Sequence, residues 1–257
     1  MEKRESVFAR SFAIVRKQFS TLWVAAVWPF IGVALCYIAI GIYLRFSEAQ
    51  SRPNPLNLWQ SMSGLGKLGI LAAFVVSTAL PQGLATAGVV NFVWKYLENG
   101  IATLGDAFST VARNLMQLVI LSVCIGGVVE FGSIFIIPGF AAMIFTAFVI
   151  PVLVIEHSGP MGAIKRSFAL AAANVAGVVG LILTSIVLGT FMMIGALIVF
   201  FILASVHLPW LGNLLAFWTC IILAESLTQM MVATMLAHLY IDARRRHEAA
   251  APVISPS

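Results

Sequence analysis

The stretch that decides the fold reads IFIIPGFAAMIFTAFVIPVLVIEHSGPMGAIKRSFALAAAN over residues 134–174. Its first half is almost entirely apolar, and the charged pair Glu156 and His157 interrupts the run. A glycine-proline pair then begins an amphipathic segment that carries Lys165 and Arg166. Glycine and proline are typical of breaks between helices. The pattern therefore predicts a helix that leaves a membrane, followed by a helix that lies on the membrane surface.

The composition of the whole chain agrees with a membrane location. Of its 257 residues, 61% are hydrophobic and only 10% are charged, and the mean hydropathy is +1.01. A soluble domain carries roughly 25% charged residues. A membrane-spanning helix needs about 20 apolar residues, so the chain has room for about six spans. We predict an all-α, polytopic membrane helix bundle in one domain, residues 21–241.

Six apolar runs, separated by polar or turn-forming residues, define the expected spans. They lie at about residues 21–44, 67–94, 115–135, 138–155, 174–204 and 209–240. The first run is too long for the apolar core of a signal peptide, so we expect it to remain uncleaved. Pro81 is expected to kink the second span. Before the spans, residues 1–20 are predicted to form an amphipathic helix, and residues 242–257 a basic, then disordered tail.

The positions of lysine and arginine predict the orientation. All but three of the 15 Lys and Arg residues fall on one side of the six expected spans, and the exceptions are Arg45, Arg52 and Lys67. Cytoplasmic segments of membrane proteins carry the positive excess. We therefore expect both termini in the cytoplasm. The even number of spans agrees with this orientation.

Three segments that lead into odd-numbered spans share one spacing, and all are expected on the cytoplasmic side. Apolar residues recur at i, i+4, i+7 and i+11, which places them on one face of a helix. The three sets are Phe8, Phe12, Val15 and Phe19; Leu104, Phe108, Val111 and Leu115; and Ile164, Phe168, Ala171 and Val175. Six residues after the aligned phenylalanine stands a side-chain amide, in Gln18, Asn114 and Asn174.

This spacing suggests three copies of one unit, an interfacial helix followed by a transmembrane hairpin. Helical spacing also arises by chance in a chain this apolar, so unrelated segments remain the alternative. A structure in which these segments are extended, or are oriented without relation to one another, would rule out the repeat.

Polar residues inside the expected spans are the strongest signs of a site. Glu225 lies near the middle of the sixth span, with Gln229 one turn later, and Glu130 lies in the outer half of the third. Gln82 follows the proline of the second span. Ionisable groups within a membrane usually face the bundle interior and often mark a pathway. Two interpretations stay open, namely hydrogen bonds that only join helices and a substrate or proton site.

Basic residues at the cytoplasmic edge form a second set. We expect Lys165, Arg166 and the run Arg244, Arg245 and Arg246 to meet anionic lipid headgroups or a membrane-protein partner. The sequence has no basic groove with interleaved aromatic residues, which argues against nucleic acid. It contains no catalytic motif or phosphate-binding loop, and Glu156, His157, His238 and Asp242 lack the spacing of a metal site. We therefore predict no catalytic residue, metal or cofactor.

Five short motifs resemble one bacterial family. They are N-G-x-x-x-x-x-D-A-F (99–108), I-P-G-F (137–140), P-V-L-V-I-E-x-x-G (151–159), A-I-K-R-S-F-x-L (163–170) and L-Y-I-D-A-R (239–244). The chain resembles the six-helix membrane domain that is fused to some glycerophosphodiester phosphodiesterases and also occurs as stand-alone integral membrane proteins. The resemblance covers the chain from about residue 96 onward. The resemblance implies a six-helix fold and a location in the inner membrane of a bacterial cell. It implies no hydrolase activity, since the hydrolase domain of the fused members is absent.

Two classes of function remain. In the first, the protein is a non-enzymatic structural or regulatory membrane protein that binds lipids or a membrane-protein partner through its cytoplasmic face. In the second, it is a small transporter or permease component with a polar site at Glu225, Glu130 and Gln82. Few charges lie within the spans and no inverted repeat is visible, so the sequence favours the first class.

Overall fold

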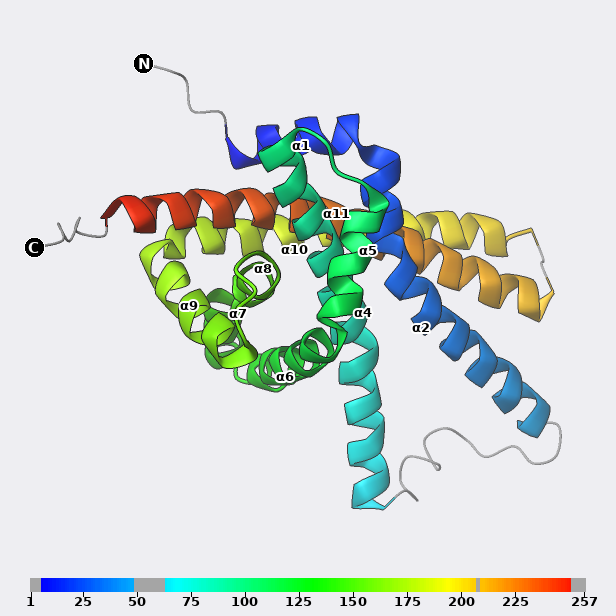
Figure 1. The fold of residues 1–257 in the computed structure, drawn as a ribbon. Coiled ribbons are helices and arrows are strands. Elements are labelled where there is room, and N and C mark those ends of the chain that lie inside the picture. Colours follow the sequence, from blue (N-terminus) through cyan, green and yellow to red (C-terminus); the bar gives the residue numbers. More distant parts are fainter. Residues whose placement is uncertain (1–5, 49–62, 207–208, 251–257) are drawn as a thin grey trace, which may run out of the picture.

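The computed structural model describes residues 6–48, 63–206 and 209–250, and their regular secondary structure is entirely α-helical (Figure 1). The all-α prediction is therefore confirmed for these residues. Most of the expected connection between the first two spans, the first residues of the chain and the end of the expected tail lie outside the described residues.

Five helices are long. They are α2 (Phe19–Glu48), α4 (Gly64–Asn99), α6 (Leu115–Ser133), α10 (Val175–Ala204) and α11 (Trp210–Ala250). Shorter helices precede or join them, namely α1 (Val7–Lys17), α5 (Leu104–Arg113), α7 (Ile137–Thr146), α8 (Val149–Ile155) and α9 (Pro160–Ala173). In Figure 1, α10 and α11 run side by side, whereas α4 runs across their direction.

Five helical stretches in the described part of the chain are long and apolar enough to cross a membrane. They are Phe19–Ile40, Leu115–Gly132, Ile137–Ile155, Val175–Ala204 and Trp210–Ala249. Their length and composition make the chain a multi-pass membrane protein. The second expected span, at about residues 67–94, lies within α4, which is not one of these five but is a continuous helix of 36 residues. Helix α4 continues through Pro81.

The expected fourth span is broken into two helices, α7 and α8. Proline at position 151 has no amide hydrogen, and its ring collides with the carbonyl four residues earlier, so a regular helix cannot run through Ala147. Ser167 of α9 satisfies the backbone groups at the break. Its Oγ accepts a hydrogen bond from Phe148 N at 3.2 Å and donates one to Phe145 O at 2.7 Å.

The last helix is longer than the sequence suggested. We expected the sixth span to end near residue 240 and a basic tail to follow, but α11 continues to Ala250. Arginine, alanine and glutamate all have high helix propensity. Arg244 Nε also donates to Glu248 Oε1 at 2.7 Å, one turn along the helix. Local preferences therefore extend the helix through the basic residues.

The three segments with repeated spacing are all helical, and each meets the next long helix at the same kind of junction. Gln18 separates α1 from α2, Asn114 separates α5 from α6, and Asn174 separates α9 from α10. Their (φ, ψ) angles are (−120°, 28°), (−105°, 14°) and (−135°, 30°). One non-helical residue thus turns the chain in each case, at the position that the aligned sequences indicated.

The same alignment describes which side chains face outward. The aligned phenylalanines Phe12, Phe108 and Phe168 are 51%, 36% and 45% exposed. Three positions around each phenylalanine are buried: the residue before it, and the residues two and three places after it. They are Ser11, Ile14 and Val15; Ala107, Thr110 and Val111; and Ser167, Leu170 and Ala171. The expected apolar stripe is therefore divided, because its phenylalanine points away from the bundle while its third member points into the bundle.

Each short helix also packs on the second long element of the preceding unit, so the arrangement closes on itself. Helix α5 packs on α4, α9 packs on α8, and α1 packs on α11, which belongs to the last unit. Ion pairs join these helices, and each uses the residue two places before the aligned phenylalanine. The pairs are Arg10 with Asp242, Asp106 with Lys95, and Arg166 with Glu156. These shared contacts support the three-unit repeat.

Helix α8 lies at the centre of the largest buried cluster. Its residues Val149, Val152, Leu153 and Val154 are all fully buried. Helix α8 packs against α4, α9 and α11. Tyr240 of α11 is also fully buried and packs against Phe148, at the start of α8. The second half of the fourth expected span is therefore buried in the core, where the three units meet.

Candidate functional site

A cavity of about 300 Å³ lies where α4, α6, α7, α8, α10 and α11 meet. We call it the central cavity. Most of its wall is apolar, and Ile125, Met143, Leu181 and Val232 are examples. Small-molecule sites in proteins are typically concave, mostly apolar and fitted with a few polar groups. The central cavity has this general character, so the positions of its polar groups matter.

Three of the four polar residues that the sequence singled out line this cavity together. Gln82 comes from α4, Glu130 from α6 and Gln229 from α11. They are far apart in the sequence, and helix packing brings them to one space. Glu130 is exposed, whereas Gln229 is partly buried. The cavity therefore presents two amides and a carboxyl group along an otherwise apolar wall.

None of these three side chains forms a hydrogen bond with another described residue. One interpretation of these residues was that they form hydrogen bonds that join helices. In the described part of the chain they form no such bonds. Neighbouring residues join the helices instead, because Trp23 Nε1 of α2 donates to Ser226 Oγ of α11 at 3.1 Å. The hydrogen-bonding groups of Gln82, Glu130 and Gln229 remain available inside the cavity.

Ser122 of α6 is a cavity residue that the sequence analysis missed. It is only 4% exposed, and its Oγ is buried without a hydrogen-bond partner among the described residues. Gly83 of α4 makes room for it, since a Cβ at residue 83 would lie 1.8 Å from Ser122 Oγ. An unpaired buried hydroxyl is unfavourable by about 1–3 kcal/mol. A ligand in the cavity can supply the missing partner.

Two further hydroxyl groups lie in the cavity wall. Ser185 Oγ donates to Ile182 O at 2.7 Å, and Thr146 Oγ1 donates to Ala142 O at 2.7 Å. Both donors are therefore used within their own helices, whereas the oxygen atoms can still accept a hydrogen bond. The cavity can bind a molecule with a few hydrogen-bonding groups on an apolar body.

Glu225 does not line the central cavity. It lines a second cavity, of about 220 Å³, between α2, α4 and α11, together with Tyr37, Trp218 and Gln82. It also borders an open depression along α10. The structure thus places Glu225 and Glu130 at two different cavities, whereas the sequence interpretation had grouped them with Gln82 in one site. Gln82 belongs to both cavities and lies between the two glutamates.

The basic residues expected to meet lipid headgroups come from α9 and α11, which pack together. Arg166 Nε lies 3.6 Å from Glu156 Oε1, and its Nη1 lies 3.4 Å from His247 Nδ1. Arg244 is paired with Glu248. Lys165, Arg245 and Arg246 are exposed, although Arg246 Nε also donates to the carbonyl of Asp242 at 3.2 Å. Two of the five cations are thus already paired with carboxylates.

Other contacts bring acidic and basic residues together at the same end of the bundle. Tyr240 OH donates to Glu156 Oε1 at 2.7 Å, and Asp242 is paired with Arg10. Among the described residues, no group of three or more His, Cys, Asp or Glu side chains could hold a metal ion.

Comparison with known proteins adds no family to this description. No family model matches the chain, and neither the curated proteins nor the solved structures that were searched contain a match to it. The resemblance of its short motifs to a bacterial membrane domain thus stays an expectation from the residues alone.

Proposed function

We propose that this chain is a six-span, non-enzymatic protein of the bacterial inner membrane that binds an amphipathic, lipid-like molecule in the central cavity. In this proposal α4 is the sixth crossing element, in addition to the five apolar stretches. The ligand places its apolar body against the cavity wall and its polar groups near Gln82, Glu130, Gln229 and Ser122. The binding of a lipid-like molecule agrees with the lipid-binding function class that the sequence favoured, although at a different place in the molecule.

The single observation that carries this proposal is a set of polar groups without protein partners that line one partly open cavity. Buried polar groups in folded proteins nearly always have hydrogen-bond partners. Here the Ser122 hydroxyl is buried without a partner among the described residues. The amides of Gln82, which is exposed, and of Gln229, which is half-buried, line the same cavity and also form no hydrogen bond with a described residue. A bound molecule with hydrogen-bonding groups would satisfy them together.

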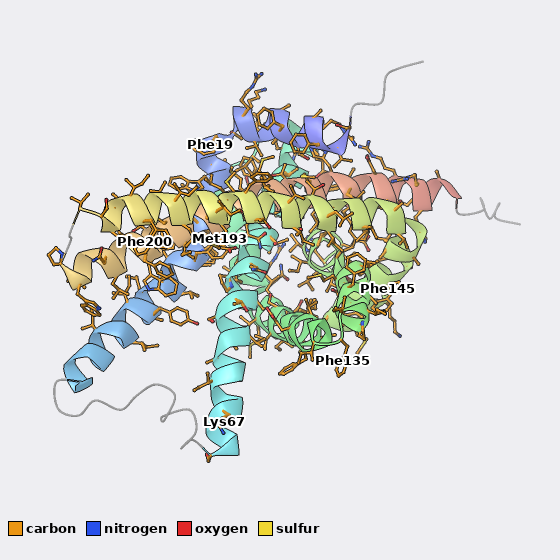
Figure 2. All side chains as sticks on the ribbon, turned by 180° about the vertical axis from the view of Figure 1, so that it is seen from behind. Phe19, Lys67, Phe135, Phe145, Met193 and Phe200 are labelled. Carbon is orange, nitrogen blue, oxygen red and sulfur yellow. The ribbon has the colours of Figure 1, made fainter. Side chains whose placement is uncertain are left out.

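The proposed orientation, with both termini in the cytoplasm, is supported by where the basic residues gather. The ion pair between Arg10 and Asp242 joins α1 to α11, and the contact of Arg166 with His247 joins α9 to α11. Lys67 lies near the end of α4 that is far from Phe19, at the junction of α1 and α2 (Figure 2). The basic segments therefore share one end of the bundle, as the positive-inside rule requires.

The experiment is native mass spectrometry of the protein extracted gently from its own membrane, with the bound masses identified. We compare the wild type with a double variant, Gln82→Leu with Gln229→Leu. We expect a bound lipid-like molecule in the wild type and an occupancy about tenfold lower in the variant, because each hydrogen bond is worth on the order of 1 kcal/mol.

The matched control is Gln117→Leu, which changes the same residue type on α6 at a position that does not line the central cavity. This variant should retain the bound molecule. The proposal fails if the wild type carries no bound molecule, or if the double variant binds it as well as the control does.

A second candidate function, a carrier or permease component, rests on the position of Gln82. This side chain lines both cavities, so polar groups follow one another from Glu130 through Gln82 to Glu225. Proteoliposomes loaded with a pH-sensitive dye test proton movement along this series. A proton flux that disappears in both Glu225→Gln and Gln82→Leu, but persists in Gln229→Leu, would favour the carrier.

A further inference from the structure

A third cavity, of about 340 Å³, lies at the end of the bundle where the basic segments gather. We call it the edge cavity. It is lined by the C-terminal part of α4, by α5, by the end of α8 and by His157, which follows α8. None of its lining residues lines the central cavity. Its polar groups therefore belong to a separate site.

The edge cavity contains hydrogen-bond donors from all three segments. Lys95 lies four residues before the end of α4, Arg113 ends α5, and His157 follows α8. Asp106 Oδ1 holds Lys95 Nζ at 2.6 Å, which fixes the ammonium group and leaves two of its three hydrogens for other acceptors. Arg113 is exposed and forms no ion pair with a described residue. These donors suit an oxyanion with several acceptor oxygens, such as a phosphate group.

A buried pair of polar side chains forms the back of the edge cavity. Asn91 is 4% exposed, and its Nδ2 donates to Thr110 Oγ1 at 2.8 Å and to Asp106 O at 2.9 Å. Because the Thr110 oxygen accepts this bond, its hydroxyl hydrogen points elsewhere and can be donated to a ligand. The cavity therefore has a fixed, desolvated donor beside its two cations.

His157 has an unusual backbone conformation at the mouth of the same cavity. Its φ angle is 51°, in the left-handed region that non-glycine residues rarely adopt. Backbone strain of this kind costs about 1–3 kcal/mol and is concentrated at functional sites. The neighbouring Glu156 is held by Tyr240 and Arg166. These contacts fix the chain directly before His157, which lines the cavity.

The edge cavity also contains one unpaired acid, Glu98, which is exposed and has no partner among the described residues. Asp106 does not line the cavity. Both of its carboxylate oxygens are already used by Lys95 and Thr103. A simple anion would leave Glu98 without a partner. A ligand that carries a phosphate and an ammonium group would be complementary to the whole set.

We propose that the edge cavity binds the phosphoethanolamine headgroup of a zwitterionic phospholipid. The phosphate interacts with Arg113, Lys95 and the Thr110 hydroxyl, and the ammonium group interacts with Glu98. Trp94 lies in the same wall, and tryptophan is enriched where a helix leaves the bilayer. At the boundary where a helix leaves the bilayer, a lipid can place its headgroup in the cavity while its acyl chains stay in the membrane.

The test is lipid titration of the purified full-length protein in detergent, with bound lipid counted by native mass spectrometry. The lipids are phosphatidylethanolamine and, for comparison, anionic phosphatidylglycerol. The variants are Arg113→Gln and Glu98→Gln. Both residues are exposed and unpaired, so neither change should prevent folding, and unchanged thermal unfolding of each variant checks this.

Each variant removes one half of the recognition. Arg113→Gln should lower the affinity for both lipids by about tenfold, because a charge-assisted hydrogen bond to phosphate is worth about 1.5–3 kcal/mol. Glu98→Gln should abolish the preference for phosphatidylethanolamine over phosphatidylglycerol. Arg16→Gln, which removes an exposed cation of α1 outside the cavity, should leave both affinities unchanged.

Three results would overturn the proposal. The first is an Arg113→Gln variant that binds both lipids as tightly as Arg16→Gln does. The second is a Glu98→Gln variant that keeps the wild-type preference. The third concerns the source of the headgroup: soluble O-phosphoethanolamine that binds as tightly as the lipid would assign the site to a free metabolite.

Discussion

At the residue scale, the Asp106 side chain has two structural roles. Its Oδ2 accepts from Thr103 N at 2.9 Å and from Thr103 Oγ1 at 2.8 Å, which completes a capping box at the start of α5. Its Oδ1 accepts from Lys95 and ties α5 to α4. The bond with Lys95, with those from Thr103, lowers the pKa of Asp106 to about 2.

This pKa predicts how stability depends on pH. Because the pKa of Asp106 is lower in the folded protein than the ordinary 3.8, its stabilising contribution is complete above pH 4 and is lost as the pH falls toward 2. Asp106→Asn should lower the free energy of unfolding at pH 7 by about 0.2–1 kcal/mol, the range for exposed ion pairs. Denaturant unfolding in detergent at pH 7 and below pH 3 measures this.

The difference between Asp106→Asn and the wild type should shrink at the lower pH. Glu98→Gln, at an exposed and unpaired acid, is the control and should change little at either pH. A difference for Asp106→Asn that is equal at both pH values would contradict the assignment.

Ser122 makes a second prediction at this scale. Its hydroxyl is buried without a partner, so Ser122→Ala removes a desolvated polar group and should leave the ligand-free protein equally stable, or more stable by up to about 2 kcal/mol. The same change should weaken binding in the central cavity. Thermal unfolding of delipidated protein and native mass spectrometry measure the two effects.

Ser185→Ala is the control for Ser122→Ala, because the Ser185 hydroxyl already donates to Ile182 O within its own helix. A marked loss of stability in ligand-free Ser122→Ala would show that the hydroxyl has a partner after all.

At the element scale, the break between α7 and α8 depends on one side chain of α9. Ser167 bonds to the amide of Phe148 and to the carbonyl of Phe145. Ser167→Ala should therefore leave two backbone groups unsatisfied and lower the free energy of unfolding by about 1–3 kcal/mol. Unfolding in detergent with a chemical denaturant measures the loss.

The repeat supplies a matched control for this variant. Ser11 occupies the aligned position in α1 and is equally buried, but its hydroxyl donates only to Val7 O of its own helix. Ser11→Ala should cost much less than Ser167→Ala. Equal losses would mean that the break at α8 does not depend on the serine.

The ion pairs between units predict which charge changes the fold tolerates. In the first and third units the short helix supplies the arginine, whereas in the second it supplies the acid, Asp106. Either polarity therefore fits this position. Arg10→Asp alone places two acids together and should destabilise the protein by about 1 kcal/mol, while the double variant with Asp242→Lys should recover most of the loss.

A double-mutant cycle on unfolding free energies measures the coupling between residues 10 and 242. Purely additive effects of the two changes would mean that the pair does not hold α1 on α11. Arg16→Asp, on an exposed site of α1, serves as the control for adding an acid to this helix.

At the scale of the whole molecule, the length of α11 limits how much of this helix can lie in the membrane. Helix α11 has 41 residues and is therefore about 60 Å long, twice the roughly 30 Å of the hydrocarbon layer. One end of α11 must lie outside the hydrocarbon. Its final residues pack with α9 and α1, which carry charged residues, so the basic end is the one outside.

Cysteine labelling tests the proposed orientation and the sixth span together. In a background without Cys36, Cys124 and Cys220, a membrane-impermeant maleimide added to intact cells should label Lys67→Cys and not Lys165→Cys or Arg245→Cys. Opening the cells should expose the latter two. Equal protection of all three positions in intact cells would mean that α4 does not cross the membrane.

The sequence by itself determined the helical class, the approximate limits of most long helices, and the short amphipathic helices. It also located the junctions at Gln18, Asn114 and Asn174. These features follow from local physics, because a chain in lipid satisfies its backbone within each helix, and hydrophobic runs mark where that occurs. The polar residues Gln82, Glu130 and Gln229 were conspicuous for the same reason.

Only the tertiary structure decided how these residues combine. It assigned Glu225 to a second cavity, brought Ser122 against Gly83, and left Arg113 and Glu98 facing one space. The physical reason is that such groupings depend on which faces of separate helices meet. Side-chain packing between distant segments sets those faces, and helical periodicity within one segment carries no information about its partner.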